Sequence, residues 1–230
     1  MVPGQAWTYL VTAGGRSVDM LMTIISVAGS QGVVDVVNQA GGTTRRTVAT
    51  CDKDTILNFP ALSAEVLLSS ALSGNINADY VSGILAPNEA AFLANNWAIS
   101  WTTQYRVSGN STINFRGNDL NVTVNPSNLT ITCQTLASGN AAFETVSVTA
   151  GTFNALKIVC RGQGQITGII NGSTITGQIS AQSTQWFAPH IGLVKMQSDF
   201  ANIDVFGVTL PLDTSGINER VELSNFKQAP

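Results

Sequence analysis

Few residues of this 230-residue chain are of the types that carry out catalysis, and they do not cluster in the sequence. His190 is the single histidine; it follows Pro189, and no local pattern supplies the partner that a general base needs. Asp52 and Asp54 could offer oxygen ligands to calcium, but no glycine-spaced acidic loop follows them. The sequence therefore predicts no catalytic residue, no metal site and no cofactor, and both segments are more simply interpreted as turns.

The three cysteines, Cys51, Cys133 and Cys160, each end a short alternating segment and form no Cys-x-x-Cys pair. Suppose residues 129–136 and 143–148 form one long strand from which residues 137–142 bulge, and the turn at Ala150-Gly151 folds 153–160 back along it. Cys133 and Cys160 then lie within a couple of residues of each other on one face, which predicts a disulfide between them and leaves Cys51 free. If residues 137–142 are an ordinary hairpin turn instead, a whole strand separates the two cysteines by about 9–10 Å and no bridge can form.

Aromatic residues supply the candidate binding residues. At the period of two that a strand imposes, Trp97, Trp101 and Tyr105 fall on one face together with Ile99 and Thr103. This stripe is interpreted either as core or as the lining of an apolar groove that accepts a lipid tail or a partner peptide. A platform for sugar rings is a third interpretation.

Alternation of apolar and polar residues dominates the chain, and turn signals interrupt it often. Asn171-Gly172 is the strongest hairpin signal. Helix is scarce: residues 87–93 predict one helical turn, and residues 61–72 fit a short helix or a strand about equally well. The sequence predicts an all-β, antiparallel fold in which two meanders build one extended sheet. The expected strands cover residues 7–11, 17–27, 32–38, 43–51, 97–107, 112–115, 120–124, 129–136, 143–148, 153–160, 163–170, 174–187, 191–200, 203–210 and 219–226.

Each of two parts begins at a proline and continues into a strand led by tryptophan: Pro3 precedes Trp7, and Pro87 precedes Trp97. This echo indicates two sheet-forming parts, about 1–86 and 87–230, with a crossover near residues 55–95; a coincidence of common strand aromatics is the alternative. No low-complexity linker separates them, so we expect one domain over residues 1–230.

Composition excludes some functions. Charged residues make up 11% of the chain, against about 25% in an ordinary soluble domain. Eleven Lys and Arg against fourteen Asp and Glu leave a net charge of −3, which argues against nucleic-acid binding. The most apolar stretch, residues 20–27, is too short to span a membrane. We expect the mature part of an exported protein, in the periplasm or at the cell surface, with its signal peptide removed; a cytoplasmic protein is the alternative.

Several segments resemble an uncharacterised group of bacterial exported proteins. They are Trp7-Thr-Tyr9, the segment Glu144–Lys157 with its E-x-V-x-V, A-G-T-F and A-L-K pattern, the segment Trp186–Lys195 with W-F-A-P-x-x-G-L-V-K, and Glu222–Asn225. The group is distantly similar to the half-barrels of lipoprotein carriers, so the resemblance implies a curved antiparallel sheet. It implies no catalytic residues, because no defined set is associated with the group.

Two functions of different classes follow. The first is a non-enzymatic, extracytoplasmic binding or carrier-like module that holds a lipid or another apolar ligand, with Trp97, Trp101 and Tyr105 as candidate contacts. The second is a structural or assembly domain of the cell envelope whose neutral hairpin, residues 163–187, pairs with other chains. A hydrolase with an unrecognised acidic site is a minor third interpretation.

Overall fold

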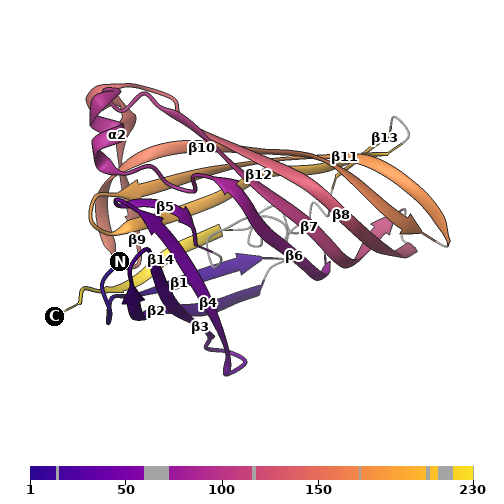
Figure 1. Ribbon diagram of the computed structural model, residues 1–230, viewed down its shortest axis with the longest axis horizontal. Coiled ribbons are helices and arrows are strands. Elements are labelled where there is room, and N and C mark those ends of the chain that lie inside the picture. The colour runs from indigo at the N-terminus through magenta and orange to yellow at the C-terminus, as the bar shows by residue number, and fades with distance from the viewer. Residues whose placement is uncertain are drawn as a thin grey trace.

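A computed structural model describes residues 1–13, 16–59, 73–115, 118–170, 172–205, 208–211 and 220–229. These residues form almost only β-strands, as the alternating sequence predicts, and Figure 1 shows long strands running the length of the molecule. The all-β fold class is confirmed. The strands are β1 (Ala6–Ala13), β2 (Arg16–Ala28), β3 (Gln31–Asn38), β4 (Thr43–Asp52), β5 (Thr55–Asn58), β6 (Ser73–Gly83), β7 (Ser100–Phe115), β8 (Asn118–Thr135), β9 (Phe143–Val148), β10 (Gly151–Ile170), β11 (Ser173–Ala188), β12 (Gly192–Val205), β13 (Val208–Pro211) and β14 (Arg220–Lys227).

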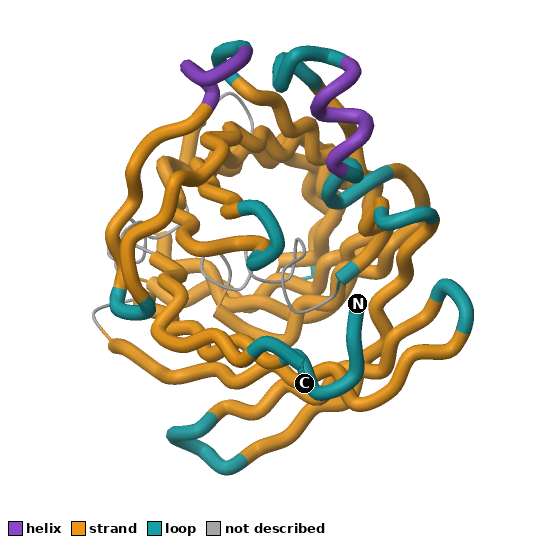
Figure 2. Tube along the Cα trace, turned by 90° about the vertical axis from the view of Figure 1, so that its left-hand side faces the viewer, coloured by secondary structure: helices purple, strands orange, loops and turns teal. Residues whose placement is uncertain are grey.

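One antiparallel sheet contains all of these strands, in the order β5-β4-β3-β2-β1-β14-β12-β11-β10-β8-β7-β6, with β9 and β13 attached at its side. Viewed end-on, the sheet curls into a nearly closed ring (Figure 2). Its two outer strands belong to consecutive parts of the chain. A short bridge brings β5 to the segment after β6, because Ile56 N–H donates to Ala86 O at 2.9 Å. The sheet is therefore more nearly closed than the expected half-barrel. Alternation of side chains could not indicate this, because it does not show how far a sheet curls.

The two expected parts, 1–86 and 87–230, pair with each other at two places in this strand order. Strand β6 lies in the first part of the sequence but pairs with β7 of the second. Strand β14, from the end of the chain, pairs with β1 from its beginning.

Long strands replace two predicted turns. Residues 108–110 and 125–127 look like turns in the sequence, but β7 and β8 run through them as one hairpin. The two segments face each other: Val107 pairs with Ser127 and Gly109 with Val124, and the register shifts between them. A bulge in paired strands uses the same residue types as a turn, so composition alone does not distinguish them. Strands β5 and β6 were not predicted, and the choice between helix and strand for residues 61–72 lies outside the described residues.

Helix α2 (Glu89–Ala94) follows the predicted helical turn after Pro87. Its N-cap is Asn88, whose side-chain oxygen accepts the Ala91 N–H at 2.9 Å, the usual way to satisfy a free amide of the first turn. A short 3₁₀ helix, η2, covers Gly139–Ala142. Among the described residues, no helix is both long enough and apolar enough to cross a bilayer.

Two groups of buried side chains fill the ring. The first cluster lies over β6, α2, β7, β8, β10 and β11 and includes Trp101, Tyr105 and Ile158. The second cluster lies mainly over β1 to β4, β12 and β14 and includes Tyr9, Met22 and Leu223. Phe187 packs against both clusters.

The second cluster is completed by the hairpin of β9 and β10. Strand β12 pairs with β14 over three residues only, 195–197 with 220–222, so the two strands diverge beyond that point. The turn between β9 and β10 reaches β14 there, and Ala150 N–H donates to Leu223 O at 3.1 Å. Val146 and Ala155, on one face of this hairpin, join the second cluster.

Candidate functional site

A cavity of about 340 Å³ lies between the two clusters. It is at the end of the ring that holds α2 and the N-terminus, which lie at the same end in Figures 1 and 2. Most of its wall is apolar or aromatic. The lining residues are Met1, Gln5, Trp7, Tyr9, Met22, Cys51, Asp54, Ile56, Phe59, Ala86, Pro87, Glu89, Phe92, Trp97, Trp101, Leu156, Ile158, Phe187, Ala188, Pro189, His190, Ile191, Gly192 and Leu193.

Helix α2 and the residues after it supply an aromatic wall. The rings of Phe92 and Trp97 stack with their centroids 5.7 Å apart, and Trp101 meets Phe92 edge-on at the same distance. Phe143 packs edge-on against Trp97 at 4.7 Å. The indole N–H of Trp101 donates to Leu85 O at 3.0 Å, which fixes the ring to the segment between β6 and α2. This wall is therefore held both by ring packing and by a hydrogen bond.

Two of the three predicted contact residues line the cavity. Trp97 and Trp101 do so, whereas Tyr105 is absent from the lining and lies 1% exposed in the first cluster, with its ring edge-on to Tyr80. The predicted strand from residue 97 is also wrong, because Trp97 has a left-handed backbone (φ 65°) and β7 begins at Ser100. The chain leaves α2 through a turn at residues 95–97.

The opposite wall comes from β1 and from the turn between β11 and β12. The Trp7 indole donates to Ile191 O at 2.7 Å, and the Tyr9 hydroxyl donates to Leu193 O at 3.0 Å. Both bonds join residues more than 180 positions apart in the chain. Burial raises the pKa of Tyr9, because its phenolate would lose the solvent that stabilises the charge. Two strand aromatics are the only sign of this wall in the sequence, since alternation does not say which strands face each other.

Polar groups are few in the cavity wall. The charged side chains are the carboxylates of Asp54 and Glu89, both exposed, and His190 is exposed beside them in the lining. Cys51 also lines the cavity and is a half-buried free thiol. Burial raises the pKa of this thiol; the α-amino group of Met1 opposes that change and the Asp54 carboxylate adds to it. The wall can therefore hold an apolar molecule and contact a polar end of it.

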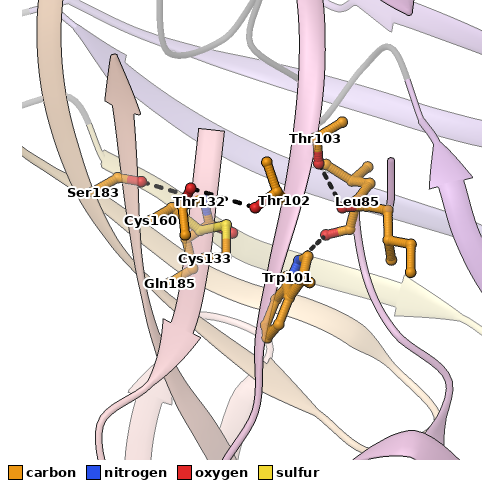
Figure 3. Close-up of a disulfide and its surroundings, with 10 residues drawn as sticks. Leu85, Trp101, Thr102, Thr103, Thr132, Cys133, Cys160, Ser183 and Gln185 are labelled. Atoms are coloured by element: carbon orange, nitrogen blue, oxygen red, sulfur yellow. Dashed lines mark hydrogen bonds between the residues drawn. A yellow bond between two sulfur atoms is a disulfide. The ribbon is translucent and has the colours of Figure 1, made fainter. Parts of the chain in front are cut away.

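Cys133 and Cys160 lie away from this wall, in the first cluster, and are joined by a disulfide with their Cα atoms 4.0 Å apart (Figure 3). They are direct partners across β8 and β10. Strands β8 and β9 lie end to end along β10, with η2 bulging between them, which is the first of the two arrangements considered from the sequence. Next to η2, Leu156 faces Phe143 and Ile158 faces Thr135.

Three of the four segments that carry the family resemblance, all except Trp7–Tyr9, meet around Trp186. Its indole N–H donates to the Glu144 carboxylate, and its ring lies 5.6 Å from the Lys157 ammonium and 5.2 Å from the Lys195 ammonium. Lys157 also pairs with Glu144 at 3.5 Å, and Lys195 with Glu222 at 3.9 Å. This arrangement, the Trp186 cluster, joins β9, β10, β11, β12 and β14 and is structural. Among the described residues, no group of three or more His, Cys, Asp or Glu side chains is arranged to hold a metal ion.

Comparisons with known proteins give little more. No protein-family model and no curated protein sequence matches this chain, so the family resemblance stays a prediction. One solved structure that resembles the fold is a protein inferred to be exported, with a YmcC-like fold, from Bacteroides fragilis; it is 13% identical, covers 99% of this chain and 97% of its own, and has a TM-score of 0.49. Another is an inferred lipoprotein from Parabacteroides distasonis, 18% identical over 98% of this chain and 96% of its own, with a TM-score of 0.49. Likenesses of this degree carry no information on ligand, activity or compartment.

Proposed function

We propose that this protein is a non-enzymatic, extracytoplasmic binding or carrier-like module that holds an apolar ligand in the cavity between its two clusters. The cavity is the observation that carries the proposal. Its volume of about 340 Å³ falls within the usual range for sites that hold small molecules. Its wall combines apolar and aromatic side chains with a few polar groups, as such sites do.

Binding would gain free energy from the removal of apolar ligand surface from water, worth about 0.8 kcal/mol for each methylene group buried. Trp7 and Trp101 are already hydrogen-bonded through their indole N–H groups, so their rings are available for apolar contact without leaving a buried donor unsatisfied. The rings of Trp7 and Trp101 are thus held in place before a hydrocarbon ligand binds.

The disulfide supports the extracytoplasmic part of the proposal. Disulfides form and persist in oxidising compartments and are rare in the cytosol. The bond between Cys133 and Cys160 lies in the first cluster, where both cysteines are nearly inaccessible to solvent.

The alternative function, assembly through residues 163–187, is not favoured by a specific contact. Strand β10 pairs with β8 as far as Ile169, and β11 pairs with β12 from Gly177 to Ala188. Both sides of this hairpin are therefore already engaged within the sheet along most of its length.

Binding of N-phenyl-1-naphthylamine, an uncharged probe that fluoresces in apolar sites, tests the proposal. We expect saturable binding of one probe per chain. Ala86→Trp places a large ring in the cavity and should weaken binding by about tenfold or more, whereas Val48→Trp adds the same ring to the exposed surface of β4 and should leave binding unchanged. Equal binding by both variants, or none by the unmodified protein, would overturn the proposal.

Cys51 offers a second readout that needs no substitution. It is the free thiol of the chain and it lines the cavity, so a bound probe should slow its reaction with a thiol reagent several-fold. Because the pKa of this thiol is raised, the reaction is best followed above pH 8. Identical labelling rates with and without saturating probe would place the probe outside the cavity.

A further inference from the structure

We infer that the ligand of this cavity is a single-chain amphiphile whose polar end is an ammonium group, and that amphiphiles ending in a carboxylate are disfavoured. The inference rests on the proposed function and names the chemistry of the ligand. It follows from three features of the wall: the charged groups in it, the aromatic rings in it, and the size of the space.

The charged side chains in the wall are both carboxylates. Asp54 lies in the turn between β4 and β5, and Glu89 in the first turn of α2; no Lys or Arg side chain belongs to the described lining. The acidic side chains of the described lining therefore have no basic side chain of Lys or Arg there to offset them. A carboxylate ligand would meet like charge there, whereas an ammonium would find a counter-charge.

Aromatic rings belong to the same lining as these carboxylates. Glu89 and the stacked pair Phe92 and Trp97 belong to the same short stretch of chain, in and directly after α2. Aromatic faces attract cations through their negative π-clouds, and the combination of rings with few competing cations is how proteins recognise quaternary ammonium groups. The same rings give a carboxylate no favourable contact.

The size of the cavity limits the rest of the ligand. About 340 Å³ is near the lower end of the range for small-molecule sites, which suits one hydrocarbon chain better than two. Buried residues of the lining such as Met22, Leu156 and Ile158 offer apolar side chains to that chain. The polar end would then remain at the exposed carboxylates.

Displacement of the naphthylamine probe by matched twelve-carbon amphiphiles tests the inference, at pH 8 and below the concentrations at which they form micelles. Dodecyltrimethylammonium should displace the probe at a concentration about tenfold lower than dodecanoate. Choline, which has the head group without the chain, should compete poorly. Equal potency of choline would overturn the assignment of an amphiphile.

Substitution of the two carboxylates gives the decisive comparison. Asp54→Asn with Glu89→Gln should abolish the preference for the ammonium while leaving probe binding intact; asparagine tolerates the left-handed backbone at position 54 (φ 67°). The control is Asp19→Asn with Asp79→Asn, which removes two exposed carboxylates outside the lining and should keep the preference.

The two proposals fail differently. If the naphthylamine probe binds but dodecanoate displaces it as well as the ammonium does, the head-group inference is wrong and the cavity function stands. If no probe or amphiphile binds, the proposed function itself is wrong. If the control pair loses the preference as fully as the cavity pair, the effect belongs to the net charge of the protein and the inference is again overturned.

Discussion

Tyr9 joins two distant parts of the chain at the wall of the cavity. Its ring is 1% exposed in the second cluster, and its hydroxyl donates to Leu193 O. A buried donor that has a partner contributes about 1 kcal/mol net, but the ionised form of the same group could neither donate this bond nor be solvated. The residue therefore makes stability depend on alkaline pH.

We expect the protein to lose stability above pH 10 because of Tyr9. The pKa of Tyr9 is raised in the folded protein, so its contribution is complete below the unfolded value of about 10 and is lost as pH rises towards the folded value. Between pH 8 and pH 11.5 the unfolded chain should gain about 2 kcal/mol from ionisation of this one group. Urea unfolding at both pH values measures the change.

The matched variant is Tyr9→Phe, which keeps the ring and removes the ionisable group. It should be about 1 kcal/mol less stable than the unmodified protein at pH 8 and equally or more stable at pH 11.5. Other lysines and tyrosines titrate in both proteins and cancel in the comparison. Parallel pH profiles for the two proteins would show that Tyr9 ionises as freely in the fold as in the unfolded chain.

At the scale of elements, the hairpin of β9 and β10 depends on contacts made far from its own turn. Its tip is bonded to β14 through Ala150, and its base is bonded to β11 through Glu144 and Trp186. The two contacts lie at opposite ends of β9. We therefore expect the contact at the base to stabilise the whole hairpin against opening away from the second cluster.

Trp186→Phe keeps an aromatic ring between the two lysines but removes the donor to Glu144. We expect the free energy of opening the hairpin to fall by about 1–2 kcal/mol. The Ala150 amide should then exchange its hydrogen about tenfold faster. Trp101→Phe removes an indole donor from another part of the fold and should leave that amide unchanged. Faster exchange at Ala150 in both variants would mean that the hairpin opens only with the whole protein.

The disulfide acts on the same strands. It joins residues 27 positions apart, and the closed loop contains η2, β9 and the turn into β10. Replacement of both cysteines by alanine should lower the free energy of unfolding by about 3.5 kcal/mol, because the unfolded chain regains the freedom of that loop. Denaturation by urea measures the loss.

A thiol count on the denatured, unreduced protein checks the premise independently. Only the Cys51 thiol should react. Three reactive thiols would exclude a disulfide, and one reactive thiol with a peptide that links positions other than 133 and 160 would show a different pairing.

At the scale of the molecule, the two clusters are parts of one structure. They share Phe187, both line the cavity, and a single sheet runs through both. We therefore expect one cooperative unfolding transition, as the expectation of a single domain over residues 1–230 requires.

Tryptophan placement allows a direct measurement. Trp97 and Trp101 report on the first cluster, and Trp7 and Trp186 on the second. We make two variants, each of which keeps one of these pairs and has phenylalanine at the other two positions. In each variant, the urea midpoint from tryptophan fluorescence should equal the midpoint from circular dichroism. Separate midpoints for fluorescence and circular dichroism would show that the clusters unfold as two units.

The sequence alone determined the fold class and much of the strand pattern, because alternation of side chains is a local property of each strand. Residues 143–148 and the turn at Ala150-Gly151 were placed correctly for this reason. The helical turn after Pro87 followed equally from local signals. Trp97 and Trp101 were candidate contacts because large aromatic residues at a period of two are visible in any sequence, although Trp97 lies before the start of β7.

The tertiary structure decided which strands meet. Nothing in the sequence brings β14 between β1 and β12, or sets Tyr9 against Leu193, because strand order depends on long-range pairing and not on local composition. The same limit explains Tyr105, which shares the alternating face of Trp101 but lies deeper in the ring than the cavity extends. The cavity has walls from residues 1–59, 86–101 and 156–193, so it exists only once the sheet has curled and brought these distant segments together.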